Sequence, residues 1–191
     1  MALSIRHSRN LIKGISREEI RNKFIIRGLW IFSLGLGVTM TTYLLIGQSF
    51  IIFGVLHLVG ISTILAWPFF SLGKWNVLAA PTIIFLGVYL QDLTFSYPWL
   101  LWLDLYPKGL YTLDYFPLLP WFGVILLGIS LGGRLYSGYA RAFKVPDLSG
   151  LPQVKLLCFF GRNSLVIYLT HQPVLVTALW LFRLIQPSSI F

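Results

Sequence analysis

The sequence predicts an all-α protein, a polytopic bundle of about five transmembrane helices. Of its 191 residues, 57% are hydrophobic and 11% are charged, and the mean hydropathy is +0.78. Soluble domains carry roughly 25% charged residues, so this chain has too few polar side chains to cover a water-facing surface. The chain also contains five long runs without Asp, Glu, Lys or Arg. These two observations exclude a soluble globular domain and a disordered chain.

The five uncharged runs have the lengths of transmembrane helices, because a hydrocarbon core of about 30 Å needs roughly 17–25 helical residues. They are apolar on every face, whereas a helix on the surface of a soluble core alternates polar and apolar faces. We predict a basic amphipathic segment over 1–27, a membrane domain over 28–185 and a short tail over 186–191. The predicted spans are 28–47, 50–72, 75–91, 115–133 and 163–182.

The net charge of +9 indicates membrane orientation and not nucleic-acid binding, because the basic residues flank the apolar runs. With the N-terminus inside, thirteen Lys and Arg residues fall on one face and two, Lys108 and Arg183, on the other. Cytoplasmic loops carry such an excess of positive charge. We therefore predict a multi-pass protein of the cell membrane with a cytoplasmic N-terminus. Asp92, Asp104 and Asp114 are expected on the outer face.

The first 27 residues precede the first predicted span and lack the apolar core of a signal peptide. Ser16 and Glu19 fit a capping box, in which each side chain bonds the backbone amide of the other residue. A helix that starts there is expected to run unbroken into the first span. The seven basic residues of this segment either contact anionic headgroups or act only as a topology signal.

Two histidines fall inside predicted spans, where polar side chains are costly and mark functional sites. His57 lies nine residues after Gln48, about 13 Å along a helix, and His171 lies nine residues after Arg162. Both are expected near the bilayer midplane, which predicts a shared polar site. A neutral imidazole whose Nδ1–H is held by a neighbour accepts a proton at Nε2, as a general base does. Alternatively, each histidine only bonds a neighbouring helix.

A second polar group opens the fifth predicted span. Arg162 stands at its cytoplasmic end, where a guanidinium binds phosphate bidentately, and Asn163 and Ser164 can satisfy free amides of the first turn. Residues 162–164 are thus candidates for cofactor binding, although snorkelling also accounts for Arg162. Ser164, Tyr168 and His171 are spaced to share one helix face.

Asp114 is the candidate catalytic carboxylate, just before Pro117 and Pro120 at the start of the fourth predicted span. It can pair with a histidine or with a substrate amine, or it can simply cap a helix. Small residues are expected to let helices approach closely. They are Gly35, Gly37, Gly54, Gly60, Gly128 and Gly132.

Three stretches resemble, in order, the motifs of one protein family. Phe53–Gly60 resembles an FGILH-x-IG helix, Asp114–Gly123 a D-x-x-PLLPW-x-G segment, and Gly161–Val174 a GR-x-SL-x-IYL-x-HQPV helix. These are motifs of the heparan-alpha-glucosaminide N-acetyltransferase catalytic-domain family of multi-span membrane acyltransferases. The resemblance covers residues 24–184. That family begins with further spans, and Met1–Ile5 is similar to the end of such an upstream helix, so we expect a shortened form of the domain.

The resemblance implies transfer of an acetyl or other acyl group from acyl-CoA to a sugar or glycolipid across the membrane. It implies acetyl-CoA or another acyl-CoA as co-substrate and no metal. It implies membrane lipids and the acceptor as partners, allows a homo-oligomer, and gives no reason to expect nucleic acid. His171 or His57 would take the acceptor's proton, and Arg162 would steer the CoA phosphates.

Two other functions are compatible with the sequence. The chain is a non-catalytic membrane protein if it is an inactive truncated member or a subunit that only packs against other helices. A small transporter would carry its substrate at a polar midplane and would show an inverted repeat. We find no such repeat, so the transporter is the weakest hypothesis.

Overall fold

The computed structural model describes residues 1–47, 50–91, 98–103, 105, 112–136 and 150–181. The chain forms two compact units, Met1–Phe143 and Lys144–Phe191, and each is described by itself. The predictions for Asp92, Asp104, Lys108, Arg183 and the tail 186–191 lie outside the described residues. The described elements are helices and short 3-10 turns, which confirms the predicted all-α class.

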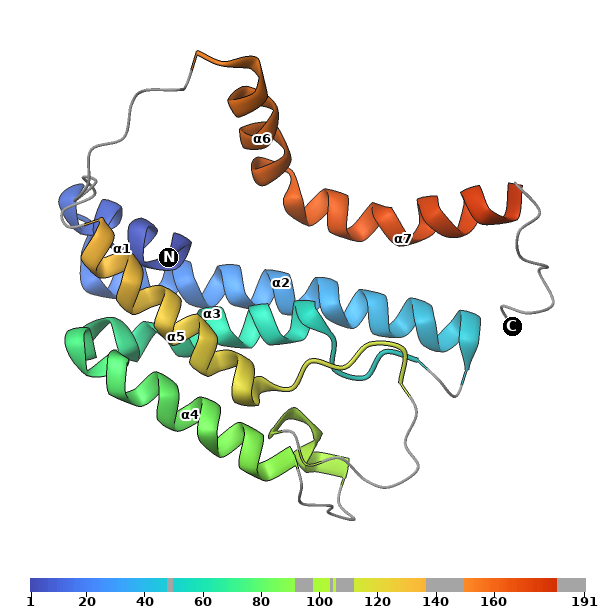
Figure 1. Ribbon diagram of the computed structural model, residues 1–191, viewed down its shortest axis with the longest axis horizontal. Helices are drawn as coiled ribbons and strands as arrows, with labels where there is room; N and C mark the ends of the chain where they lie inside the picture. The colour runs from blue at the N-terminus through green and yellow to red at the C-terminus, as the bar shows by residue number, and fades with distance from the viewer. Residues whose placement is uncertain (48–49, 92–97, 104, 106–111, 137–149, 182–191) are drawn as a thin grey trace. The chain divides into compact units, whose positions relative to one another are not determined.

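The described part of the first unit forms five α-helices (Figure 1): α1 (Ala2–Ile12), α2 (Arg17–Ile46), α3 (Val55–Leu72), α4 (Asn76–Gln91) and α5 (Leu118–Leu135). Two short 3-10 segments accompany them, η1 (Gly73–Trp75) and η2 (Pro98–Leu103). Helix α3 packs antiparallel to α2, and α5 packs against α4, α3 and α1. The second unit contains α6 (Pro152–Arg162) and α7 (Ser164–Leu181).

Three helical stretches of the described residues are long and apolar enough to cross a membrane: 17–44, 55–91 and 118–135. The second stretch holds both α3 and α4, which η1 and the positive φ of Gly73 separate. The predicted fifth span, 163–182, coincides with α7 but is not among these three stretches. Five spans are therefore slightly more than the described residues show.

Two of the predicted spans begin later than expected. Helix α3 begins at Val55 and not at 50, and α5 begins at Leu118 and not at 115. Residues 50–54 are a run of aromatic and β-branched side chains ending in glycine, which favours extended backbone. At the start of α5, Pro117 and Pro120 disfavour the α-region in the residues that precede them, and Leu119, inside the first turn of α5, is indeed extended (φ −93°, ψ 135°).

The start of α2 follows the predicted capping pattern. The Ser16 hydroxyl accepts a hydrogen bond from the Glu19 amide at 3.2 Å, and α2 runs unbroken for 30 residues. The Glu19 carboxylate instead bonds the Lys23 ammonium at 2.7 Å, so this carboxylate stabilises the helix surface. The unbroken first helix and its Ser16 N-cap are therefore confirmed, whereas the described residues do not show the predicted bond between the Glu19 carboxylate and the Ser16 amide.

Glycines allow the closest helix contacts, as predicted. Gly28 of α2 and Gly60 of α3 face one another, and a Cβ at Gly60 would lie 2.8 Å from the Phe32 backbone nitrogen. Gly128 and Gly132 of α5 face Met1, the residue just before α1. Gly37 has no heavy atom within 4 Å of a Cβ built on it, so the packing prediction is wrong for that residue.

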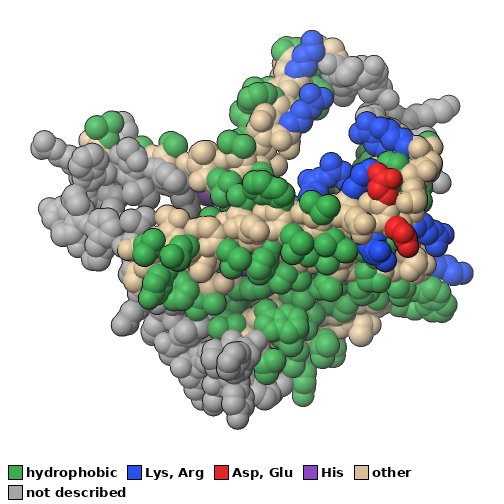
Figure 2. Space-filling model, turned by 180° about the vertical axis from the view of Figure 1, so that it is seen from behind, with side chains coloured by type: hydrophobic (Ala, Val, Ile, Leu, Met, Phe, Trp, Pro, Cys, Tyr) green, Lys and Arg blue, Asp and Glu red, His purple; other side chains and the backbone are tan. Residues whose placement is uncertain are grey.

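The outer surface of the first unit is largely apolar (Figure 2). Phe85, Leu44 and Trp30 are 74%, 69% and 65% exposed. Soluble proteins rarely expose so many large apolar side chains together. Lys and Arg side chains gather at the end that carries α1 and the start of α2 (Figure 2). The first unit therefore has the surface of a membrane protein with one basic end.

Helix α1 docks at this basic end through His7. Its ring stacks on Phe70 with centroids 4.4 Å apart and meets Trp67 edge-on at 5.8 Å. Burial, and secondly the positive charge of Arg17, lowers the pKa of His7 from its ordinary value of 6.5. Since the unfolded chain then binds the proton more readily, acid favours unfolding.

We expect the thermal stability of the purified chain to fall as the pH drops through 6.5 towards the lowered pKa of His7. Above pH 6.5 the ring is neutral in both the folded and the unfolded chain, so His7 should cause no loss of stability there. A His7→Phe variant keeps an aromatic ring on Phe70 and should lose this part of the pH dependence. If both proteins lose the same stability on acidification, His7 is not responsible.

Candidate active site

Two extended segments run side by side at the start of α3 and α5. Phe53 and Tyr115 form a parallel bridge, and the Phe116 amide donates to the Phe53 carbonyl at 2.9 Å. The Thr112 hydroxyl donates to the Phe50 carbonyl at 2.8 Å. These bonds satisfy backbone groups that a helix would otherwise pair internally.

The first extended segment lies along the second half of α2. The Ile51 amide donates to the Thr42 hydroxyl at 3.2 Å, and the Tyr43 ring meets Phe50 at a centroid distance of 5.2 Å. Irregular backbone at membrane depth is tolerated where protein buries it and satisfies its polar groups. The segment therefore carries the chain back along α2 before α3 begins.

This path gives His57 a different position in its helix from the one predicted. His57 is the third residue of α3, and the described residues 50–54 before this helix are not helical. The ring nevertheless packs against the middle of α2, because a Cβ on Gly35 would lie 3.0 Å from its Cε1. Gly35 is eleven residues, about 17 Å of helix, before the end of α2 at Ile46. The extended segment before α3 thus places His57 inside the bundle, although His57 is close to the start of its own helix.

The imidazole of His57 is 3% exposed and is held by aromatic rings and one amide. Phe32 meets it edge-on at 5.1 Å, and Phe53 lies 5.5 Å away at 30°. The Gly54 amide donates to Nδ1 at 3.3 Å, so Nε2 carries the proton in the neutral ring. Within the described residues, Nε2 has no hydrogen-bond partner. His57 therefore presents a buried N–H donor.

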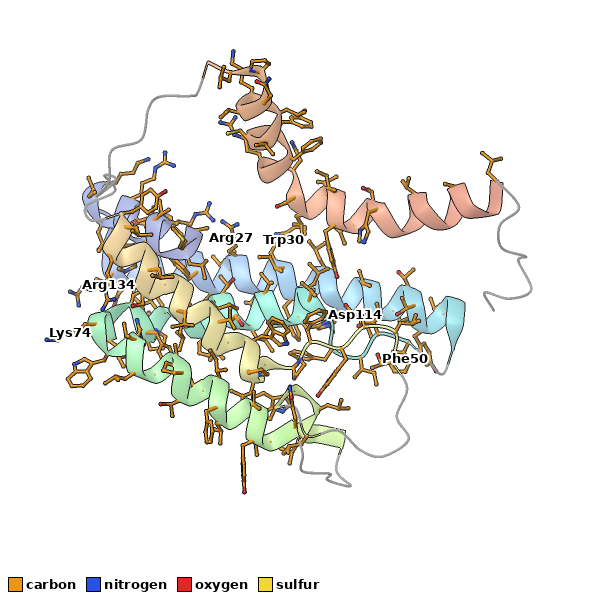
Figure 3. The ribbon with its side chains drawn as sticks, viewed as in Figure 1. Arg27, Trp30, Phe50, Lys74, Asp114 and Arg134 are labelled. Carbon is orange, nitrogen blue, oxygen red and sulfur yellow. The ribbon has the colours of Figure 1, made fainter. Side chains whose placement is uncertain are left out.

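Asp114 lies at the N-terminus of α3, which is not the helix that follows it in the chain (Figure 3). The Val55 amide donates to its Oδ2 at 3.4 Å, and a Cβ on Gly54 would lie 2.5 Å from that oxygen. The positive end of a helix dipole stabilises a carboxylate there. The structure thus brings Asp114 and His57 together at one helix start.

The remaining predicted site residues belong to the second unit. Arg162 ends α6, the Asn163 side-chain amide donates to the Phe159 carbonyl at 2.9 Å, and Ser164 begins α7. Asn163 thus satisfies the end of α6 and not the free amides of α7. Nδ1 of His171 bonds the Tyr168 carbonyl one turn earlier, so Nδ1 carries the proton and Nε2 is left as acceptor.

The two histidines therefore hold opposite tautomers, His57 with a donor at Nε2 and His171 with an acceptor. They lie in different units, and the expectation that they share a site stays a prediction. Among the described residues, no group of three or more His, Cys, Asp or Glu side chains could hold a metal ion.

Gly35, which was predicted to allow close helix packing, makes room for the His57 ring. Sequence reasoning missed Thr42 and Thr112, which bond the backbone of the first extended segment. The run of aromatic and β-branched residues over 50–53 was the available signal, since it favours extended structure.

The fold and this site define a class: a polytopic helical membrane protein with a carboxylate and a histidine at a buried helix start. The family model described as heparan-alpha-glucosaminide N-acetyltransferase, catalytic, matches residues 1–173. The chain belongs to this family, which makes it a membrane acetyltransferase-like protein. No curated protein and no solved structure matches the chain.

Proposed function

We propose that the chain is a membrane acyltransferase that moves an acetyl or other acyl group from acyl-CoA to a sugar or glycolipid acceptor across the membrane. Family membership supports acetyl-CoA as donor. The observation that carries the proposal is that Asp114 and His57 both lie at the start of α3, where the Nε2–H of His57 has no partner among the described residues. We further propose a cell-membrane location with a cytoplasmic N-terminus, from the charge asymmetry of the sequence.

The chemistry requires an acceptor nitrogen or oxygen to attack the thioester carbonyl carbon. A C–N or C–O bond forms, the C–S bond breaks, and the acceptor's proton leaves with the CoA thiol. In our proposal, Asp114 binds and orients the acceptor group through its carboxylate. The His57 Nε2–H donates to the thioester oxygen, where negative charge develops in the transition state.

His171 is our candidate for the proton acceptor. Its Nδ1–H is held by the Tyr168 carbonyl, which fixes the ring and leaves the Nε2 lone pair available. Arg162, with Asn163 and Ser164, stays a candidate for contacts to the CoA phosphates.

We expect purified wild-type chain in nanodiscs to release CoA thiol from acetyl-CoA when an amino sugar is present, and His171→Ala to lower this rate about 100-fold or more. Thr170→Ala is the matched control, because Thr170 is adjacent to His171 on α7 and its hydroxyl bonds carbonyls of its own helix, those of Val166 and Ile167. Equal rates in wild type and His171→Ala would remove His171 from the mechanism. No acceptor-dependent release in the wild type would support the non-catalytic alternative.

A further inference from the structure

A basic groove lies between α1 and the start of α2, away from the His57 site. It measures about 620 Å³, within the range of small-molecule sites. Arg6 and Lys13 line it from α1 and its end, and Lys23 and Arg27 line it from α2. It continues into a second hollow of about 480 Å³ that shares Arg6 and Lys13. Four cationic side chains therefore surround one open groove.

The groove has an apolar wall beside the charges. Phe24 is 2% exposed and forms part of the packed interior, whereas Trp30 is 65% exposed. Arg27 and Trp30 leave α2 on the same side, one turn apart (Figure 3). An aromatic face beside a guanidinium suits a ligand that carries both phosphate and a flat or apolar group.

The charges of the groove are mostly uncompensated. Glu19 pairs with Lys23 at 2.7 Å, and both partners are about half exposed. In the part of the chain that the structure describes, no other salt bridge reaches a lining residue of this groove. Clustered positive side chains repel one another, and a multiply charged anion relieves that repulsion. The groove is therefore built for phosphate.

The groove also lies within reach of the His57 site along α2. Arg27 and Gly35, which contacts His57, are eight residues apart, or about 12 Å of helix. An extended pantetheine arm is longer than this. A CoA whose phosphates sit at Arg27 can therefore direct its thioester towards the start of α3.

We propose that this groove binds the phosphate groups of a phosphorylated ligand, with the CoA moiety of the acyl donor as the ligand. The choice of donor rests on the proposed function, whereas the phosphate chemistry rests on the groove alone. An anionic lipid headgroup offers the same phosphate chemistry and is the second source that the experiment must separate.

The test measures CoA binding by calorimetry to the full chain in detergent. We expect the double variant Arg6→Gln/Arg27→Gln to weaken binding about tenfold or more, because arginine contacts to phosphate are charge-assisted. Dephospho-CoA should bind wild type more weakly than CoA does, and pantetheine should not discriminate wild type from variant. Arg134→Gln is the matched control, a cation at the end of α5 that does not line the groove.

Native mass spectrometry of retained phosphatidylglycerol forms a second arm. A loss of CoA affinity confined to the groove variant supports the donor site. Unchanged CoA affinity with loss of retained phosphatidylglycerol supports the phosphate groove and overturns the donor as its ligand. If neither changes, or if Arg134→Gln weakens CoA binding as much, the groove proposal is wrong.

Binding needs no turnover, so the two proposals fail separately. Wild-type chain that binds CoA through the groove but transfers nothing would contradict the proposed function alone. Chain that transfers acetyl while the groove variant binds CoA normally would contradict the groove alone.

Discussion

Asp114→Asn is expected to lower acyl transfer about 100-fold or more while leaving the fold in place. The amide oxygen of asparagine can still accept the Val55 hydrogen bond that Asp114 accepts at 3.4 Å. The Asp114→Asn substitution removes only the negative charge, which we propose binds the acceptor. The measurement is kcat/KM for thiol release, with a thermal melt of each protein.

Asp114→Ala serves as the companion variant because it removes the charge and the hydrogen bond to α3 together. It should lose activity to a similar extent and also lose about 1 kcal/mol of stability, as other cap deletions do. If Asp114→Asn retains wild-type activity, the carboxylate is only a helix cap, and its proposed role in the reaction is wrong.

Gly60→Ala is expected to destabilise the protein by about 1–3 kcal/mol, which is the usual range for overpacking. The added Cβ would lie 2.8 Å from the Phe32 nitrogen and 2.9 Å from the Gly28 carbonyl oxygen, and both are backbone atoms that cannot turn aside. Helices α2 and α3 would have to separate, which also loosens the contact between Gly35 and His57. Unfolding in detergent, followed by circular dichroism, measures the loss.

Gly37→Ala is the matched control on the same helix pair. Its new Cβ meets no heavy atom within 4 Å, and alanine is favoured over glycine in a helix by up to about 1 kcal/mol. We expect unchanged or slightly raised stability. Equal losses in the two variants would mean that the effect comes from glycine flexibility and not from the close approach of α2 and α3.

Composition and charge were sufficient to predict the helical membrane class. Local residue patterns predicted the N-cap at Ser16 and most of the close glycine contacts. These features depend on local patterns, and residues such as Ser16 and Glu19 interact within one turn. Helices α3 and α5 begin later than the uncharged runs predicted, because such a run does not distinguish helix from extended chain. Prolines 117 and 120 and the run over 50–53 carried the missing signal.

The candidate site was predictable in its residues but not in its arrangement. His57 was selected because polar groups are costly in apolar spans, and Asp114 because it stands before two prolines at the start of the fourth predicted span. Their meeting depends on a long-range bridge between Phe53 and Tyr115, and no local pattern specifies that pairing. The His57 tautomer likewise follows from the Gly54 amide and not from the sequence.

The most direct test of the account is a single-turnover reaction of the wild-type chain in nanodiscs with acetyl-CoA labelled in its acetyl group. An amino sugar is supplied as acceptor, and the products are identified by mass spectrometry. The account predicts labelled N-acetyl sugar formed in step with free CoA thiol. Label that stays on CoA, or that leaves only as acetate whether or not the sugar is present, would contradict it.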